Sequence, residues 1–397
     1  MKILVLSNKN PFPPRDGGEL AIRNMIQEMV EYGHEVSLLM MTTSKHHKKK
    51  SPDIDSINAH NVFINTDIRP LKLLWNYLFG KMPYIAQRFV NTTYAERLID
   101  LLYSKRFDIV QLEGLYLAPY IDTIRKVSQA KIVLRGHNVE HEIWQRNSEL
   151  EKNLFKKMYL KSMADRLKRF EVTSLFKIDG LLPITERDEK KFRDLGYGKL
   201  SLTIPFGIKA KNYQIKSLGI DKISVGYIGA LDWFPNREGI IWFLENIWKK
   251  YIDSFPDIEF HIAGRNADPE LKRIIHFTPN VKFHGEVDSA QDFIQKYPIM
   301  VVPLFSGSGM RVKIIEGMLL KRAMIVTPIA AEGISVSEGE NILIAEKPDD
   351  FAGKLIQLMK SKEKIKEIGE AAHHFAMNNY DNHFLMENLT KFYQSLK

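Results

Sequence analysis

The stretch PLFSGSGMRVKIIEG, residues 303–317, joins an apolar run to an amphipathic one through a turn of small residues. The run IMVV, just before it, has the length and composition of a buried strand, whereas RVKIIEGMLLK has the periodicity of a helix. Strand, tight turn and helix in this order are the repeating unit of parallel α/β sheets. The sequence therefore predicts an α/β protein in which this turn lies at the carboxyl edge of a sheet.

Short apolar runs of parallel-strand length recur along the chain, with helical patterns between many of them. The first half contains such runs at 2–7, 35–41, 61–65, 108–112, 131–135, 180–184 and 200–204. The second half contains them at 223–230, 258–264, 281–285, 299–304, 323–328 and 341–345. Because strand and helix alternate twice over, the pattern predicts two Rossmann-like doubly wound domains that face a central cleft.

The expected domain boundaries follow from breaks in this pattern. We expect an N-terminal domain over residues 1–208 and a C-terminal one over 223–379, joined by a polar, weakly patterned linker at 209–222. The amphipathic helix at about 380–397 is expected to pack back on the first domain. Residues 146–177 are expected to form one long helix.

Composition excludes several classes of protein. The chain has 397 residues and no cysteine, so disulfides, thiolate catalysis and cysteine-ligated metal are excluded. No apolar run approaches the roughly 20 residues of a membrane span, and the opening MKILVLSN is too short and polar for a signal peptide. These features lead us to expect a cytoplasmic protein.

The net charge of +9 lies entirely in the first half of the chain. Residues 1–205 contain 33 Lys and Arg against 24 Asp and Glu, whereas the two signs balance over 206–397. Two interpretations stay open: an acidic partner for that half, or a merely basic surface. No helix-turn-helix, RNA-recognition or zinc pattern occurs, so a nucleic-acid partner is not expected.

The turn of residues 307–309 has the features of an anion site. Gly307 and Gly309 leave backbone N–H groups open, and a helix N-terminus favours a negative ligand. Arg311 and Lys313 are electrostatically unfavourable at that end of a helix unless an anion lies above them. Glu316, one turn further on, is suited to accept the two hydroxyls of a ribose. The combination indicates a nucleoside diphosphate; a tight turn before a charged helix start is the alternative.

Other nucleotide and metal patterns are missing from the sequence. There is no G-x-x-x-x-G-K-[ST], and the first strand is followed by SNKNPFPPRDGGE rather than by G-x-G-x-x-G. A nicotinamide dehydrogenase is therefore not expected. Asp53 and Asp55 form the one D-x-D sequence, which we interpret as a solvated loop, and we expect neither a metal nor a cofactor.

Eight motifs in order resemble those of the family 4 (group 1) retaining glycosyltransferases, which have the GT-B fold. They are PFPPRDGGELAIRN (11–24), LRGHNVEHEIWQR (134–146), LLPITERDEKKF (181–192), TIPFGI (203–208), GALDWFPNREGIIWFLENIW (229–248), FHGEV (283–287), the opening stretch and AEGI (331–334). The resemblance covers nearly the whole chain.

The resemblance implies that the second domain binds a nucleotide sugar. Glu316 would hold the ribose hydroxyls, while Arg311 and Lys313 would neutralise the diphosphate. The other implied donor-binding residues are Gly229, Arg237, Arg265, His284, Val287, Ser308, Gly309 and Met310. Ser308 occupies the position at which many members carry a second glutamate that faces the donor sugar, so the donor stays undetermined.

In the first domain, the resemblance implies that Gly17 and Gly18 form the glycine loop near the diphosphate and acceptor. His137 matches the active-site histidine, which contacts the donor sugar or acceptor; a satisfied buried histidine is the alternative. Glu113, Asn138 and Glu140 are candidate residues on the acceptor side.

The implied activity is metal-independent transfer, with retention, of a sugar from a nucleoside-diphosphate sugar to a glycan or lipid-linked acceptor. Synthesis of a cell-surface polysaccharide or glycoconjugate is the expected setting. A nucleotide-sugar epimerase of the same fold and a non-catalytic nucleotide-sugar-binding protein stay open as alternatives.

The segment 70–89, PLKLLWNYLFGKMPYIAQRF, interleaves aromatic residues with cations. These are Trp75, Tyr77, Phe79, Tyr84 and Phe89 with Lys72, Lys81 and Arg88. Such a mixture suits contact with an anionic membrane, a sugar-stacking acceptor lip or a pair of core helices. Our hypothesis is peripheral contact with the inner face of the cell membrane.

Overall fold

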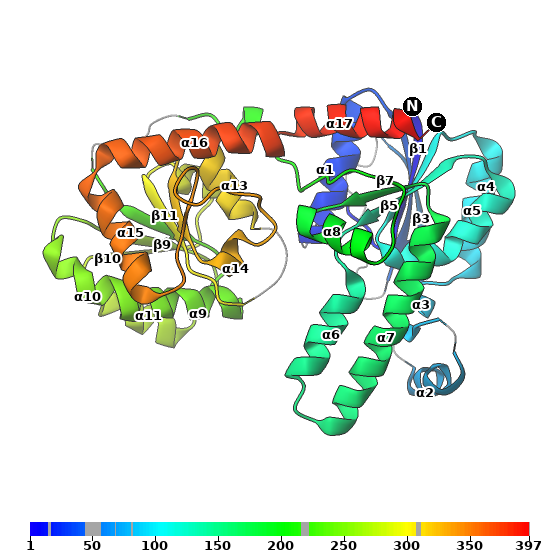
Figure 1. The fold of residues 1–397 in the computed structure, drawn as a ribbon, viewed down its shortest axis with the longest axis horizontal. Coiled ribbons are helices and arrows are strands. Elements are labelled where there is room, and N and C mark those ends of the chain that lie inside the picture. Colours follow the sequence, from blue (N-terminus) through cyan, green and yellow to red (C-terminus); the bar gives the residue numbers. More distant parts are fainter. Residues whose placement is uncertain are drawn as a thin grey trace. The chain divides into compact units, whose positions relative to one another are not determined.

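The computed structural model divides the chain into two units, each with its own parallel sheet (Figure 1). Unit 1 comprises Met1–Gly207 and Leu385–Lys397, and unit 2 comprises Ile208–Phe384. The structure describes residues 1–14, 17–43, 57–67, 69–80, 82–215, 222–306 and 311–396. Asp53 and Asp55 therefore lie outside the described residues.

Unit 1 contains a seven-stranded parallel sheet in the order β3-β2-β1-β4-β5-β6-β7. Its strands are β1 (Lys2–Ser7), β2 (Glu35–Thr42), β3 (Asn58–Phe63), β4 (Ile109–Glu113), β5 (Lys131–Gly136), β6 (Gly180–Pro183) and β7 (Leu200–Ser201). Leu4 and Leu6 of β1 pack into the core on one face, whereas Ile3 and Val5 pack into the core on the other. Burial on both faces explains why these strands read as continuous apolar runs.

The helices of unit 1 lie on both faces of this sheet or extend beyond it, as the lower part of Figure 1 shows. They are α1 (Gly17–Glu31), α2 (Pro70–Phe79), α3 (Tyr84–Gln87), α4 (Thr92–Ser104), α5 (Ile121–Val127), α6 (Glu140–Leu150), α7 (Leu154–Lys177), α8 (Glu186–Asp194) and α17 (Asn382–Ser395). A 3₁₀-helix, Leu115–Tyr120, follows β4.

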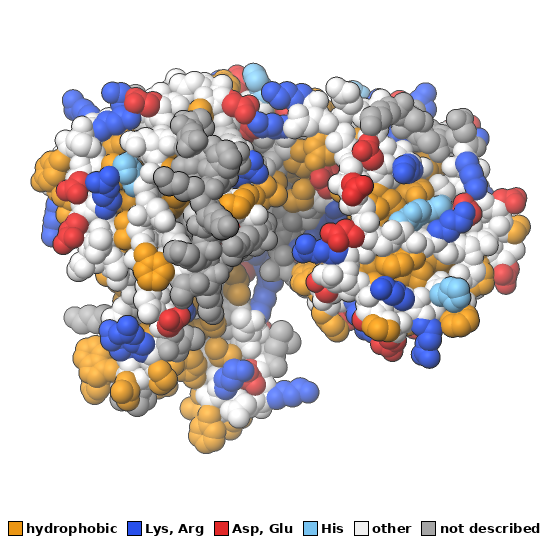
Figure 2. Space-filling model, turned by 180° about the vertical axis from the view of Figure 1, so that it is seen from behind, with side chains coloured by type: hydrophobic (Ala, Val, Ile, Leu, Met, Phe, Trp, Pro, Cys, Tyr) orange, Lys and Arg blue, Asp and Glu red, His pale blue; other side chains and the backbone are white. Residues whose placement is uncertain are grey.

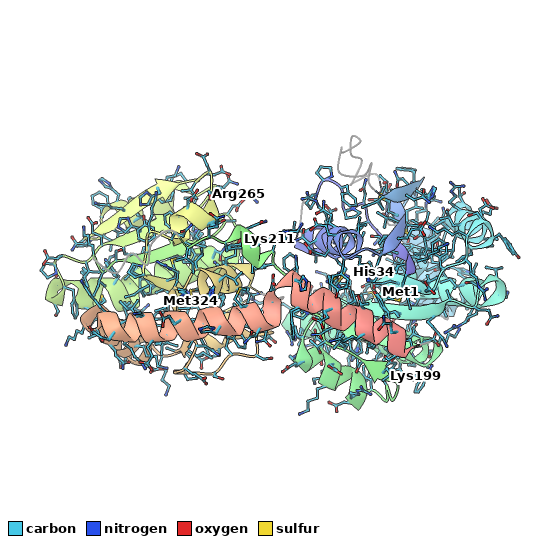
Figure 3. All side chains as sticks on the ribbon, turned by 90° about the horizontal axis from the view of Figure 1, so that it is seen from above. Met1, His34, Lys199, Lys211, Arg265 and Met324 are labelled. Carbon is cyan, nitrogen blue, oxygen red and sulfur yellow. The ribbon has the colours of Figure 1, made fainter. Side chains whose placement is uncertain are left out.

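Helix α17 packs on unit 1 beside α1. His34, which follows α1, has its Nδ1 3.3 Å from the Met1 amino group and its Nε2 2.9 Å from the Thr390 hydroxyl (Figure 3). At Gly180 an added Cβ would lie 2.8 Å from Phe392, so only a glycine lets α17 approach β6 this closely. The last segment of the chain is thus part of the core of unit 1.

Unit 2 contains a six-stranded parallel sheet in the order β10-β9-β8-β11-β12-β13. Its strands are β8 (Val225–Ile228), β9 (Phe260–Ala263), β10 (Val281–Gly285), β11 (Ile299–Val302), β12 (Ala323–Val326) and β13 (Leu343–Ile344). The described parts of the two units confirm the expected α/β class and all thirteen expected strands.

The helices of unit 2 again cover both faces of the sheet. They are α9 (Phe234–Phe243), α10 (Lys249–Tyr251), α11 (Pro269–His276), α12 (Ala290–Ile294), α13 (Val312–Leu319), α14 (Pro328–Ala331), α15 (Pro348–Lys360) and α16 (Lys362–Tyr380). A π-helical turn, Leu244–Trp248, joins α9 to α10. Helix α13 follows the carboxyl end of β11 in the sequence. It carries Lys313 and Glu316 of the opening stretch, and Arg311 directly precedes it.

Two segments differ from what the sequence led us to expect. The single helix expected over 146–177 is instead a hairpin of α6 and α7, because Asn153 caps α7 by accepting a hydrogen bond from the Lys156 amide at 3.1 Å. Within the expected linker 209–222, the described residues 209–215 belong to unit 2 and include a 3₁₀ turn, Ala210–Asn212.

Among the described residues, no helix has the length and apolar character that a membrane span requires. The same residues include no group of three or more histidine or carboxylate side chains arranged to hold a metal ion.

Candidate functional site

Polar side chains meet at the carboxyl ends of β4 and β5 in unit 1. Glu113 is the last residue of β4, and His137 follows β5, the neighbouring parallel strand. The Glu113 Oε2 lies 2.8 Å from the His137 Nε2 and 3.4 Å from an Arg135 guanidinium nitrogen. The Gln111 amide donates a 2.5 Å hydrogen bond to the other carboxylate oxygen.

Glu113 is ionised in this group and carries its negative charge. Burial alone raises the pKa of its carboxyl, but Arg135, His137 and Gln111 together outweigh burial, so the pKa lies below its usual range. Since a carboxylate only accepts hydrogen bonds, the His137 Nε2 must carry the proton that joins them. This contact fixes the orientation of the imidazole ring and leaves its Nδ1 for other partners.

Three residues that support Glu113, directly or through a neighbour, were not selected by our sequence reasoning: Gln111, Arg135 and Tyr393. The Tyr393 hydroxyl of α17 donates a hydrogen bond to the Gln111 Oε1, and Arg135 is 1% exposed. A weak signal existed, since Gln111 and Arg135 interrupt the apolar runs DIVQL and KIVLR. A buried polar residue in such a run needs a partner, but the sequence does not name it.

Glu140, the first residue of α6, belongs to a second buried group. It accepts a 2.7 Å hydrogen bond from the Tyr116 hydroxyl, and its own backbone amide donates to Glu171 at 3.0 Å. Burial raises the pKa of Glu140 to about 7, with Glu171 adding to the rise and Tyr116 and Asn138 opposing it. Glu171 also lies 2.5 Å from the His141 Nδ1. Glu140 is therefore poised to exchange a proton near neutral pH.

Gly17 and Gly18 are the first two residues of α1. Their place at a helix N-terminus is compatible with the expected glycine loop. The residues just before them, 15 and 16, lie outside the described part of the chain, so the loop itself stays a prediction.

In unit 2, the Lys313 side chain of α13 reaches the carboxyl end of β8. Its ammonium donates to the Ile228 carbonyl at 3.0 Å and to the Asn236 Oδ1 at 3.1 Å, and it lies 4.6 Å from the centre of the Tyr227 ring. Burial lowers the pKa of Lys313 to about 7; nearby Arg311 adds to this effect and Glu316 opposes it. An anion placed here would be stabilised by the protonated amine.

Gly229, directly after β8, is required by the packing around Lys313. A Cβ at this position would lie 3.0 Å from the Lys313 amine, and 2.9 Å from both the Asn236 amide nitrogen and the Tyr227 hydroxyl. Contacts this short would push the amine away from its acceptors. The structure thus gives Gly229 a role in positioning Lys313.

Glu316 lies one turn after Lys313 on the same helix, as the spacing predicts. Its Oε1 accepts a 2.7 Å hydrogen bond from the Tyr213 hydroxyl. Burial raises the pKa of Glu316, and Tyr213 and Lys313 oppose this rise only in part. Sequence reasoning missed Tyr213 because it lies in the polar segment that we interpreted as a linker.

Arg311 immediately precedes α13 and is largely buried. Its guanidinium carbon lies 5.9 Å from the centre of the Trp233 ring, and burial lowers its pKa. The N-terminal end of α13 thus carries three charged residues, Arg311, Lys313 and Glu316. Ser308, Gly309 and Met310 lie outside the described residues, so their expected contacts stay predictions.

Arg237, another donor candidate, already has two carboxylate partners. Arg237 is ion-paired with Glu270 and, at 2.6 Å, with Asp268. A second negative partner would have to compete with these carboxylates, which weakens the case for Arg237 as a phosphate ligand.

Arg265 is exposed just beyond the carboxyl end of β9 (Figure 3). His284 on β10 has its Nε2 3.0 Å from the His261 Nδ1, and the His261 ring stacks on Tyr297 with centres 4.4 Å apart. Val287 follows β10 and is half-buried. None of these contacts tests a role in nucleotide binding.

A comparison with protein families matches residues 222–361 to "Glycosyl transferases group 1". The matched residues include the strand β8, the helix α13 and the group formed by Lys313 and Glu316. Over these residues the chain is similar to the group 1 glycosyltransferases. Its two Rossmann-like units are those of the GT-B fold, as the structural neighbours below indicate.

Two curated proteins are similar to this chain. A Klebsiella pneumoniae protein, the uncharacterized 44.6 kDa protein in cps region, is 24% identical over 98% of this chain and 99% of its own length. The uncharacterized glycosyltransferase MJ1178 of Methanocaldococcus jannaschii is 31% identical over 134 residues, which are 32% of this chain and 38% of that protein.

Solved structures match the whole length of this chain. Sucrose-phosphate synthase from Thermosynechococcus elongatus superposes with a TM-score of 0.68 at 14% identity, over 100% of this chain and 99% of that one. Anabaena HepE in complex with UDP superposes with a TM-score of 0.67 at 13% identity, over 100% of both chains. At such identity, the likeness establishes the fold.

Proposed function

We propose that the chain is a retaining, metal-independent family 4 glycosyltransferase of the hexosyltransferase type. It transfers a sugar from a nucleoside-diphosphate sugar to a glycan or lipid-linked acceptor. The observation that carries this proposal is the placement of Arg311, Lys313 and Glu316 at one helix end, within the segment that matches the group 1 glycosyltransferases.

The chemistry of this helix end suits a nucleoside diphosphate. Glu316 accepts the ribose hydroxyls, while Arg311 and Lys313 stand where the charge of a leaving diphosphate develops. Burial lowers the pKa of both cations, and that of Lys313 to about 7. A bound diphosphate would therefore favour the charged form of Lys313, while Arg311 stays protonated. These cations stabilise the leaving group in place of a metal ion.

The proposed acceptor chemistry involves unit 1. His137, held by Glu113, contacts the donor sugar or the acceptor, as the resemblance to the family implies. In retaining transfer, the leaving phosphate takes the acceptor proton on the same face of the sugar. No protein carboxylate base is then needed, and Glu113 serves to orient His137.

Relatives support the proposed class of substrates. HepE structures contain UDP and UDP-glucose, and one TarM structure contains UDP with α-GlcNAc-glycerol. We propose a nucleotide sugar and a glycan acceptor of this general kind, and a role in cell-surface polysaccharide synthesis in view of the Klebsiella relative from a cps region. The proposed location is cytoplasmic, with peripheral contact at an anionic membrane.

Calorimetric titration tests the donor site. UDP, GDP, dTDP and ADP are titrated without divalent metal into the wild type, Glu316→Ala and the control Glu245→Ala, whose side chain is exposed in the π-helical turn. We expect one nucleotide to bind the wild type and the control, and Glu316→Ala to lose it. Equal binding by all three proteins would refute the assignment of Glu316.

A product assay separates transfer from the alternatives. Incubation with the nucleotide sugar alone yields an epimerised nucleotide sugar only if the protein is an epimerase. A glycosyltransferase instead forms product in proportion to the added acceptor. Binding without turnover for any glycan or lipid-linked acceptor would favour a non-catalytic protein.

A further inference from the structure

One face of α2 exposes an apolar stripe. Leu71, Trp75 and Phe79 are spaced four residues apart and therefore share a face of the helix, and they are 84%, 62% and 68% exposed. The Trp75 and Phe79 rings contact each other with centres 5.9 Å apart. The opposite side of α2 is fixed to the protein through Asn76, which is buried and donates to Gln87 at 2.7 Å.

Other aromatic residues of the segment 70–89 face inward. Tyr84 is buried, and Phe89 stacks on Tyr116 with ring centres 5.5 Å apart. Only part of the aromatic and cationic pattern is therefore available to a partner. Lys81 lies outside the described residues.

A second apolar group lies at the tip of the α6–α7 hairpin. Leu154, Phe155 and Met158 in the first turns of α7 are 70%, 86% and 64% exposed. Four exposed lysines accompany them, namely Lys152, Lys156, Lys157 and Lys161. Glu149 and Glu151 are the acidic residues of the segment 149–161, so its balance is basic.

The two groups belong to the same side of unit 1. Tyr77 of α2 contacts Tyr159 of α7 with ring centres 5.6 Å apart, and Arg166 of α7 donates to the Asn76 Oδ1 at 3.3 Å and to the Met82 carbonyl at 3.1 Å. Figure 2 shows hydrophobic side chains gathered at α2 and at the hairpin tip, with basic side chains beside them. Two segments about 80 residues apart in the sequence thus form one surface.

A cavity of about 710 Å³ opens beside the α2 stripe. Its lining includes Trp75 and the cationic residues Arg69, Lys72 and Arg88, against the single carboxylate of Asp67. Arg88 is held in place by hydrogen bonds to the Thr66 carbonyl. Cations beside exposed aromatic residues match the boundary between the headgroups and acyl chains of an anionic bilayer.

We propose that α2 and the tip of the α6–α7 hairpin form a bipartite membrane-binding face for anionic phospholipid. Leu71, Trp75, Phe79, Leu154, Phe155 and Met158 enter the interfacial region of the bilayer. The lysines of the hairpin and the cations of the cavity contact lipid phosphates. Charge complementarity selects lipid over a second copy of this chain, since pairing two such basic surfaces would bring like charges together.

This inference rests on the proposed function in one respect: the membrane-binding face holds the enzyme beside a lipid-linked acceptor. Neither element contributes a residue that we assign to the donor site or to the His137 group. Membrane binding and nucleotide binding are therefore measured independently on the same protein.

Flotation of the full chain with lipid vesicles tests the proposal. One set of vesicles is pure phosphatidylcholine, and the other contains about 30% phosphatidylglycerol. The anionic lipid supplies the negative surface potential that attracts basic segments. The variants are Trp75→Ser/Phe79→Ser, Leu154→Ser/Phe155→Ser and Lys156→Gln/Lys157→Gln. Tyr103→Ser/Phe277→Ser is the matched control, since both residues are more than 70% exposed but lie on other surfaces.

We expect the wild type and the control to float with anionic vesicles only. Each apolar pair should weaken binding at least tenfold, and each removed lysine should weaken it roughly fivefold. All variants should keep wild-type nucleotide binding, because their changes are exposed and involve none of the residues that we assign to the donor site.

Three results would overturn the proposal. The first is that the wild type does not float with anionic vesicles, and the second is that the variants float as well as the wild type. The third is that the wild type forms a dimer in solution that the same substitutions disrupt, which would assign the face to a second copy. Loss of nucleotide binding in Glu316→Ala with unchanged flotation would leave both proposals standing separately.

Discussion

The His137 Nε2 lies 2.8 Å from the Glu113 Oε2, and Glu113 is at the same time paired with the buried guanidinium of Arg135. One buried carboxylate thus holds both a candidate active-site imidazole and a structural cation. Its two tasks make its removal informative, since activity and stability should both respond.

Glu113→Gln should lower kcat and destabilise unit 1. The neutral amide leaves Arg135 without its counterion, which costs about 3 kcal/mol in the free energy of unfolding. It also weakens the hold on His137, so kcat should fall at least about tenfold with little change in KM for the donor. Urea unfolding and steady-state kinetics measure the two effects.

Asp179→Asn is the control for this experiment. Asp179 forms a 2.7 Å ion pair with Arg125 in the same unit and accepts from the Ile132 amide, but it is remote from His137 in the hydrogen-bond network. We expect lower stability and unchanged kcat. A Glu113→Gln enzyme with wild-type kcat would argue against a role for Glu113 in positioning His137.

Binding of a nucleoside diphosphate should be accompanied by proton uptake at Lys313. The pKa of Lys313 is about 7 without ligand, so the amine is mostly neutral at pH 8. A bound diphosphate favours the charged form and raises this pKa, which should draw in close to one proton at pH 8 and almost none at pH 6. Titrations in buffers with different ionisation enthalpies measure this uptake.

Lys313→Met supplies the comparison. It should abolish the pH-dependent proton uptake and weaken nucleotide binding. It should also raise the stability of the ligand-free protein by about 1 kcal/mol at pH 7, since a partly buried, desolvated cation is replaced by an apolar side chain of similar length. Unchanged uptake in this variant would place the titrating group elsewhere.

Gly229→Ala should weaken nucleotide binding about tenfold, because the new Cβ would displace the Lys313 amine, which lies 3.0 Å from its position.

Gly239→Ala should instead unfold unit 2, since its Cβ would lie 1.7 Å from the Pro303 carbonyl oxygen. Gly353→Ala in α15 meets no atom within 4 Å and should stabilise the helix by about 0.5 to 1 kcal/mol. Calorimetry and thermal unfolding separate these three outcomes.

Glu140→Gln should change how stability depends on pH. The pKa of Glu140 is about 7 when folded and near 4.5 when unfolded, so between these values the folded protein binds more protons and loses stability as pH rises. The amide removes this loss and can still accept from Tyr116. The variant should therefore gain stability over the wild type, by up to about 3 kcal/mol at pH 8.

Urea unfolding at pH 5, 6, 7 and 8 measures this difference. Glu149→Gln, an exposed change on the same helix, should follow the wild type at every pH. A constant offset between Glu140→Gln and the wild type would mean that Glu140 does not titrate in this range.

Much of the fold could be predicted because it depends on local periodicity. A strand that is buried on both faces of a sheet has a continuous apolar sequence, as in KILVLS, whereas a surface strand alternates apolar and polar residues. Arg311, Lys313 and Glu316 were likewise found from spacing, since a helix places residues three or four apart on one face. The break at Asn153 was missed, because a residue that caps a helix also occurs inside longer helical patterns.

Contacts between distant segments were decided by tertiary packing. Tyr393 reaches Gln111 across 282 positions, Tyr213 reaches Glu316 across 103, and Tyr77 meets Tyr159 across 82. Periodicity tells which face of an element is buried but not which element covers it. The sequence by itself determined two parallel α/β sheets and a charged helix start. Only the folded chain decided which side chains hold His137 and Glu316 and set their protonation, because burial and partners arise from packing.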